Sequence, residues 1–331
     1  MNRLRFIILW LGAALLASCS ADMESEAQPS EQQAIQLTAQ GVSSLGQTRA
    51  VNSVDLQNTA FIAGEDVAVY LVDQSNASTY TTTPYRFRTS AADAGRNALT
   101  YYSDASTAST LYYPVAASAS IDIYGFYPYS KFSSSPRNVT SLSVNVNADQ
   151  STAANYRSSD VMIATAITGQ ARTSSVVGLT FRHLMAKLII RLKQGVYSDV
   201  SVVNATHLTG STLTIGNVTT EATLNMGTGS VTPGGNSTTV TVASSTNLYF
   251  YYDNAGNPTD NTTEYAIILP AQALTGKTIT ITTGASKTIS GTLPTLSLAS
   301  GSCTVLTLTV NDSGIEATRS NYGSGGSQIW D

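Results

Sequence analysis

The chain is poor in the residues from which catalytic and metal sites are usually built. Its 331 residues include only two cysteines and two histidines, and no C-x-x-C, H-E-x-x-H, G-x-S-x-G or G-x-G-x-x-G motif is present. The carboxylates are scattered, without a pair whose sequence context suggests general acid–base chemistry. We therefore expect no catalytic residue, no metal site and no cofactor, and we do not expect an enzyme.

Charge is also scarce. Charged residues make up 11% of the chain, against roughly 25% in a typical soluble protein, and Ser, Thr, Asn and Gly replace them. The formal net charge of -4 provides no basic surface, which argues against nucleic acid as a partner. Such a weakly charged, hydroxyl-rich composition is typical of an extracellular surface.

Long apolar runs are missing except at the start of the chain. There, a short basic segment precedes the apolar run 6–16, which is too short for a permanent membrane span. Leu16-Ala17-Ser18-Cys19 follows and matches a bacterial lipobox, in which the cysteine is acylated. We interpret residues 1–18 as a lipoprotein signal peptide and Cys19 as a lipid (palmitate) attachment point in the outer membrane. The alternative is an ordinary signal peptide with an incidental cysteine.

Residues 19–49 form a separate segment. An acidic, polar tether comes first, and then Ile35, Leu37 and Ala39 alternate with polar residues, the period of a half-buried strand. A Gly/Ser-rich stretch leads from this strand to Arg49 and Ala50. The sequence therefore predicts an isolated strand that a loop joins to an exposed arginine.

Nearly every later periodic segment reads as a strand, with turn residues between them. The expected strands are 67–72, 110–115, 120–128, 142–147, 161–167, 184–193, 212–218, 238–243, 248–252, 264–270, 278–283 and 303–310. In 184–193, Leu188, Ile190 and Leu192 predict a core face, and the opposite, solvent-exposed face is predicted to carry Lys187, Arg191 and Lys193. A single helical turn is expected where "SSDVMIATA" begins. This pattern predicts an all-β protein, with a domain boundary near residues 168–175.

Four further features have alternative interpretations. His183 and His207 are expected to have structural roles, and Cys303 to be a small buried side chain. Asp253, Asn257 and Asp260 could bind calcium, but an ordinary hairpin loop is the simpler interpretation. The tyrosine-rich stretches, such as 124–129 and 249–252, suit cross-strand packing or contact with sugars or proteins.

Several motifs occur in an order that resembles a known family. They are the lipobox, an arginine near position 50, "YYP", "IDIYGFYPY", "DVMIATA", "FRHLMAKLIIRL", "YAIILPAQAL" and "LASGSCTVLTLTV". Together they resemble the fimbrillin family, the subunits of type V pili of Bacteroidetes-type bacteria. The resemblance extends from the lipobox to about Val310.

The resemblance implies a fold and a function. It implies two transthyretin-like β-sandwich domains in tandem, residues 50–172 and 173–331, in a lipoprotein precursor of a cell-surface fimbrium. An arginine-specific, trypsin-like protease would cut after Arg49 and remove the strand of residues 35–39. A strand of the next subunit would fill the open groove by β-augmentation, so subunits would polymerise head to tail and contribute to adhesion.

The donor strand is expected in the C-terminal tail, although apolar alternation there is thin. Its candidate residues are Ile315, Ala317, Ile329 and Trp330, or part of "VLTLTV". A weak donor leaves open a tip or anchor subunit, which needs only the groove. The chain could instead be a lipid-anchored surface adhesin that keeps residues 19–49, or a glycan-binding surface lipoprotein with a host or bacterial surface ligand.

Overall fold

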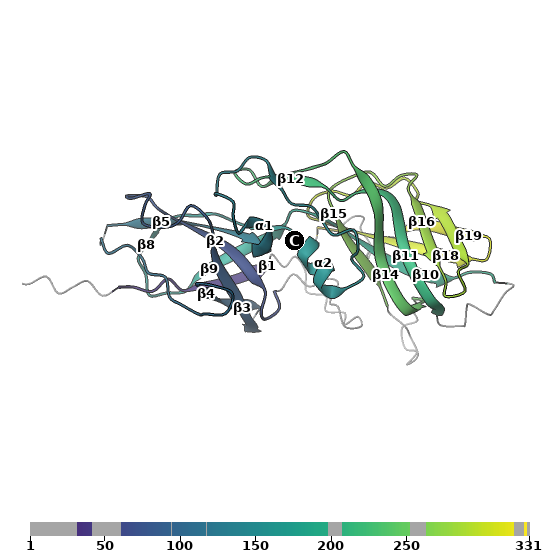
Figure 1. Ribbon diagram of the computed structural model, residues 1–331, viewed down its shortest axis with the longest axis horizontal. Helices are drawn as coiled ribbons and strands as arrows, with labels where there is room; N and C mark the ends of the chain where they lie inside the picture. Colours follow the sequence, from purple (N-terminus) through teal and green to yellow (C-terminus); the bar gives the residue numbers. More distant parts are fainter. Residues whose placement is uncertain are drawn as a thin grey trace, which may run out of the picture. The chain divides into compact units, whose positions relative to one another are not determined.

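The protein is all-β, as predicted (Figure 1). The computed structural model describes residues 32–41, 61–93, 95–116, 118–197, 207–251, 263–320 and 328–329. Within these residues, no helix is long and apolar enough to cross a membrane.

The first group of strands forms one sheet that closes on itself. Its order is β2-β3-β4-β1-β9-β7-β5-β8, and β2 also pairs with β5, which joins the seven strands β2, β3, β4, β1, β9, β7 and β5 into a β-ring. The strands are β1 (Leu37–Gly41), β2 (Asp66–Asp73), β3 (Tyr85–Asp93), β4 (Arg96–Tyr102), β5 (Ser120–Tyr127), β7 (Met162–Ala164), β8 (Ile167–Ala171) and β9 (Val177–His183). These pairings form one closed sheet and not the two separate sheets of an open sandwich. The expectation of two transthyretin-like β-sandwich domains in tandem stays a prediction.

Alternate side chains of the strands fill the interior of the β-ring. In β2, Val67, Val69 and Leu71 belong to one apolar cluster with side chains of β1, β5 and β9. Ala68 and Tyr70, on the opposite face of β2, belong to the second cluster of the protein. Burial on both faces explains why this strand is an almost continuous apolar run.

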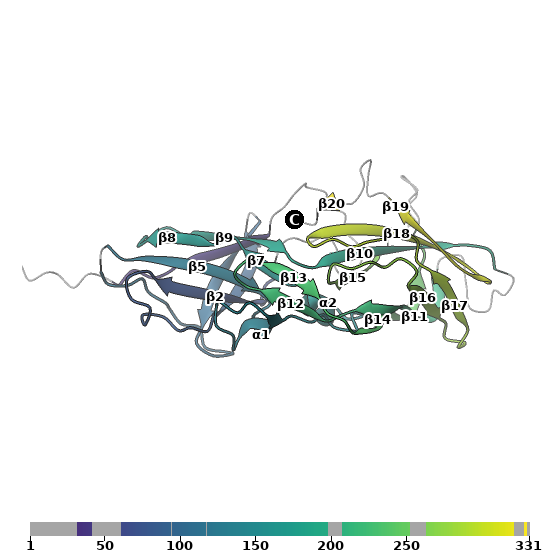
Figure 2. The ribbon, with the colours of Figure 1, turned by 90° about the horizontal axis from the view of Figure 1, so that it is seen from above.

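The remaining strands form three further sheets, which Figure 2 shows from above. The five-stranded sheet contains β10 (Ala186–Gln194), β15 (Tyr265–Leu269), β18 (Ser302–Asn311), β19 (Gly314–Ser320) and β20 (Gln328–Ile329). The four-stranded sheet contains β11 (His207–Thr219), β14 (Ser237–Tyr249), β16 (Thr278–Thr282) and β17 (Thr288–Thr292). The three-stranded sheet contains β6 (Leu142–Ser143), β12 (Ala222–Asn225) and β13 (Ser230–Pro233). Leu188 of β10 and Leu213 of β11 share one core cluster.

Two short helices lie in the connections, α1 (Tyr129–Phe132) and α2 (Ala153–Ser159). Thr152 caps α2, because its side chain accepts a hydrogen bond from Asn155 N. The helical turn expected in "SSDVMIATA" matches the last residues of α2, while most of this helix was not predicted from the sequence.

The prediction of a solvent-exposed face on β10 is wrong for the first half of the strand. Lys187 is 1% exposed and Ile189 is fully buried, although Lys193 is exposed as expected. Lys187 lies at the centre of the sheet, opposite Cys303 in β18 and Ile268 in β15, and its burial shows that this face is covered there. Alternation along one strand cannot show that both faces are covered.

The remaining sequence interpretations have mixed outcomes. His183 is buried, with its Nδ1 3.0 Å from a carboxylate oxygen of Asp160, which confirms a structural role. His207 is the first residue of β11 and lies opposite Tyr249. The calcium candidates 253–260 lie outside the described residues. β9 lies beyond residue 173 yet belongs to the β-ring, and the domain division at that residue stays a prediction.

Candidate functional site

The strand predicted at residues 35–39 exists and is part of the β-ring. Strand β1 covers Leu37–Gly41, and residues before it already make strand-like contacts. Ile35 N donates to Leu111 O at 2.8 Å, and Tyr113 N donates to Gln33 O at 2.9 Å. The segment in which apolar and polar residues alternate is thus paired through its main chain, as a strand is.

β1 has a neighbouring strand on each side. It pairs antiparallel with β4, where Leu37 lies opposite Leu99, and parallel with β9, where Leu37 lies opposite Val177. It is therefore a central strand of the sheet (Figure 1). Without β1, the β-ring would end in two unpaired edges, β4 and β9, whose free N–H and C=O groups would invite another strand.

The inward side chains of β1 are buried. Exposure is 7% for Ile35, 2% for Leu37 and 0% for Ala39. At about 1.5–3 kcal/mol for each large aliphatic side chain, Ile35 and Leu37 together contribute roughly 3–6 kcal/mol to holding the strand. On the outward face, Gln40 Nε2 donates to Thr180 Oγ1 at 3.1 Å, which adds a contact to β9.

The inward side chains of β1 become smaller along the chain, from Ile35 and Leu37 to Ala39. Ala39 lies opposite Asn97 in β4 and Leu179 in β9, and both of these are fully buried. Asn97 Nδ2 donates to Phe61 O at 2.9 Å and to Ser90 O at 2.8 Å, which fixes it in place. Ala39, which is itself 0% exposed, is thus enclosed by buried neighbours. Sequence reasoning did not find Asn97, because a polar residue in a strand gives no signal of burial.

The C-terminal candidates lie in a different sheet from β1. Ile315 and Ala317 belong to β19, which pairs antiparallel with β18 at the edge of the five-stranded sheet. Ile315 is 7% exposed, and Ala317 packs against the same core. The main chain of Ile315 also touches β17, since a Cβ added at Gly291 would collide with Ile315 O.

Four predicted site residues, Cys19, Arg49, Ala50 and Trp330, lie outside the described residues, and Ile329 is described only as a backbone position in β20. The structure therefore brings together Ile35, Leu37 and Ala39 and, separately, Ile315 and Ala317. Among the described residues, no cluster of three or more His, Cys, Asp or Glu could hold a metal ion.

Known proteins resemble this chain along most of its length. A family model described as fimbrillin-like matches residues 48–323. A relative named "Putative fimbrium subunit Fim1C", from Bacteroides uniformis, is 25% identical over 324 residues, which cover 96% of this chain and 94% of the relative. These matches confirm the resemblance seen in the sequence motifs.

Solved structures share the fold. A "putative cell adhesion protein" from Bacteroides uniformis has a TM-score of 0.62 at 18% identity, over 92% of this chain and 100% of that chain. One with the same description from Bacteroides ovatus has a TM-score of 0.60 at 16% identity, over 88% of this chain and 96% of that chain.

Proposed function

Because the chain belongs to the fimbrillin-like family, we propose that it is a fimbrial subunit that polymerises by exchanging one β-strand between neighbours. The observation that carries this proposal is the position of β1. It is a buried central strand of the β-ring, yet it comes from a segment that precedes the rest of the ring in the sequence. A strand of this kind can be replaced without changing any other pairing in the ring.

Proteolysis after Arg49 would make β1 exchangeable. The cut lies between the end of β1 at Gly41 and the next described residue, Phe61. After it, β1 would be held only by its hydrogen bonds and its buried side chains. Ala50 would become the new N-terminus, and Cys19 with its lipid would leave together with the released segment.

Several arginines within the fold are engaged in contacts that a protease would have to break. Arg88 Nε donates to Asp66 at 2.8 Å, and its guanidinium stacks on Tyr102. Arg191 pairs with Glu264 and stacks on Tyr251. Arg319 lies within β19, and cleavage there would require the strand to leave β18. These contacts favour cleavage outside the paired strands.

β19 is the donor that best suits this groove. Its Ile315-x-Ala317 repeats the large-then-small order of Leu37-x-Ala39 in β1. A β19 strand bound with the polarity of β1 would place Ile315 at the Leu37 position and Ala317 at the Ala39 position. Its side chains would then reproduce the fit of β1 at these two positions. Ile329 and Trp330 remain alternative donor residues.

The rest of the proposal concerns export and location. Residues 1–18 would direct export, and lipid on Cys19 would hold the precursor in the outer membrane until cleavage. The mature chain would consist of two transthyretin-like β-sandwich domains, 50–172 and 173–331, in a surface fimbrium that contributes to adhesion. An arginine-specific, trypsin-like protease and other fimbrial subunits would be its partners.

The decisive experiment uses the full-length Cys19→Ala precursor, which lacks the lipid. It is incubated with an arginine-specific protease, its new N-terminus is sequenced, and assembly is followed by gel filtration. We expect a new N-terminus at Ala50 and a ladder of polymers. Arg49→Lys retains the positive charge but should block both events, while Arg96→Lys, at an exposed position in a β-hairpin, should block neither.

Two further outcomes would point to a different role. Cleavage at Ala50 without polymers would contradict self-assembly through β19 and favour a tip subunit. An intact Arg49 bond in the folded precursor would contradict strand exchange and favour a lipid-anchored adhesin that keeps β1.

A further inference from the structure

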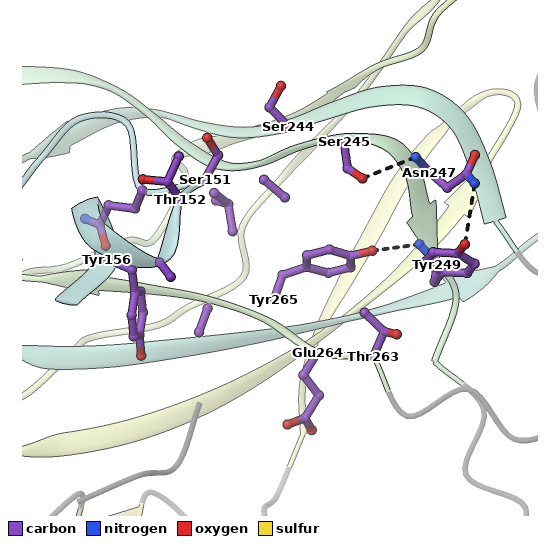
Figure 3. Close-up of a pocket in the computed structure, with 15 residues that line it drawn as sticks. Ser151, Thr152, Tyr156, Ser244, Ser245, Asn247, Tyr249, Thr263, Glu264 and Tyr265 are labelled. Carbon is purple, nitrogen blue, oxygen red and sulfur yellow. Dashed lines mark hydrogen bonds between the residues drawn. The ribbon is translucent and has the colours of Figure 1, made fainter. Parts of the chain in front are cut away.

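We propose that a pocket between β14, β15 and residues 150–156 binds a neutral carbohydrate. This cavity, called here the Tyr265 pocket, has a volume of about 380 Å³ (Figure 3). The described residues that line it include none of β1 or β19, so the proposed strand exchange does not use it. The inference therefore goes beyond the proposed function and does not depend on it.

The pocket exists because two sheet edges separate. β14 is an edge of the four-stranded sheet and β15 an edge of the five-stranded sheet. Gln150 joins these edges at one end, where its side-chain amide donates to Ile268 O at 2.8 Å and accepts from Ile268 N at 2.9 Å. Its main-chain N donates to Thr241 O at 2.9 Å. Beyond Gln150, the space between the two edges stays open.

Tyr265 crosses this space. Its side chain reaches from β15 toward β14, and its hydroxyl accepts a hydrogen bond from Tyr249 N at 2.6 Å (Figure 3). Burial raises the pKa of Tyr265, so the hydroxyl stays protonated at physiological pH. Because the hydroxyl oxygen accepts the Tyr249 bond, its proton is positioned to be donated to a ligand oxygen.

A β-bulge supplies the polar wall. The register between β11 and β14 shifts between Thr241 and Ala243, where Val242 is the additional residue. Ser244 and Ser245 then follow, two exposed hydroxyl residues that line the pocket. The pocket is lined further by the polar side chains of Ser151, Thr152, Asn247 and Thr263.

Among the described residues that line the pocket, no charged side chain faces the ligand space. Glu264 contributes to the lining, but its carboxylate points away from Tyr265 in Figure 3 and pairs with Arg191 at 2.6 Å. A site of neutral donors and acceptors selects a neutral ligand rich in hydroxyl groups, because an ion would lose its hydration without a compensating charge.

An aromatic ring completes the site. Tyr249 is 37% exposed and packs one side against His207, at 5.3 Å between ring centroids. The exposed part of such a ring packs well against the apolar C–H face of a sugar. The cavity volume suits about one or two sugar rings. Hydroxyl, amide and aromatic groups together identify the ligand class as a neutral hexose or N-acetylhexosamine.

The test uses the uncut Cys19→Ala precursor and ligand-observed NMR with glucose, galactose, mannose, N-acetylglucosamine and N-acetylgalactosamine. We expect binding of at least one sugar, with a Kd on the order of millimolar. Asn247→Ala should weaken it roughly tenfold, the loss of about one hydrogen bond. Ser245→Trp, which fills the pocket from an exposed position, should abolish binding without unfolding the protein.

Tyr112→Ala is the matched control, since Tyr112 is 42% exposed and does not line the pocket. It should leave the affinity unchanged. Absence of binding to all five sugars, or equal binding by wild type and Ser245→Trp, would overturn the proposal. So would occupation of the pocket by a strand-forming peptide in preference to every sugar. None of these results bears on polymerisation, which is measured separately after cleavage.

Discussion

Leu37 of β1 lies directly opposite Leu99 of β4, and both side chains are buried in the β-ring. The pair joins a segment that precedes Arg49 to a strand that follows it. A contact of this kind ties the stability of the ring to a strand that the proposed cleavage after Arg49 would separate from it.

Leu37→Ala should destabilise the precursor by about 2–5 kcal/mol, because it removes a large buried side chain and leaves a cavity. Chemical denaturation of the Cys19→Ala precursor measures this change. Thr38→Ala is the matched control on the outward face of the same strand and should cost less than about 1 kcal/mol. Equal effects of the two substitutions would contradict the burial of Leu37 in the ring.

Gly291→Ala should weaken the attachment of β19, because the added Cβ would collide with the main chain of Ile315. If β19 is the donor strand, a weaker attachment lowers the cost of releasing it. We therefore expect a lower melting temperature together with faster polymer growth after cleavage. Calorimetry and time-resolved gel filtration measure the two effects.

Gly235→Ala is the control for this prediction, since a Cβ at Gly235 would meet nothing within 4 Å. It should change neither the melting temperature nor the rate of growth appreciably. Slower growth in Gly291→Ala than in wild type would indicate that the donor lies elsewhere in the tail, with Ile329 and Trp330 as the next candidates.

Local patterns were sufficient to predict β1 and the all-β class. Ile35, Leu37 and Ala39 alternate with polar residues, and a two-residue period is the direct signature of a strand with one buried face. The pairing of β1 with β4 and β9 could not be predicted, since register depends on side chains more than fifty residues away.

The closure of the β-ring and the burial of both faces of β2 and β10 could not be predicted from the sequence either. Nothing in the sequence near Val69 shows that β2 pairs with β5 and closes the ring. Lys187 looked solvent-exposed because lysine usually is, yet it is buried at the centre of a sheet. The Tyr265 pocket depends on Gln150 and Ile268, which are 118 residues apart, and on a bulge that has no sequence signature.

Glu264→Gln should destabilise the protein by about 3 kcal/mol or more, because it leaves the positive charge of Arg191 without its carboxylate in a largely buried site. The partly exposed pair of Lys287 and Asp312 is the matched comparison. There, Lys287→Gln should cost less than about 1 kcal/mol. Denaturant titrations of both variants test the difference, and a Glu264→Gln variant as stable as wild type would contradict it.

Cys303 should react with iodoacetamide about 100-fold more slowly at pH 8 in the folded Cys19→Ala protein than in urea. Burial raises the pKa of this thiol from 9.0 to about 11, so the reactive thiolate is correspondingly rarer in the folded state. Because the folded state holds the proton more tightly, the contribution of Cys303 to stability is complete below pH 9 and is lost as the pH rises toward 11. Cys303→Ala should lack this part of the pH dependence, which denaturant titrations between pH 8 and 11 would measure. Equal alkylation rates in the folded and unfolded states would contradict the raised pKa.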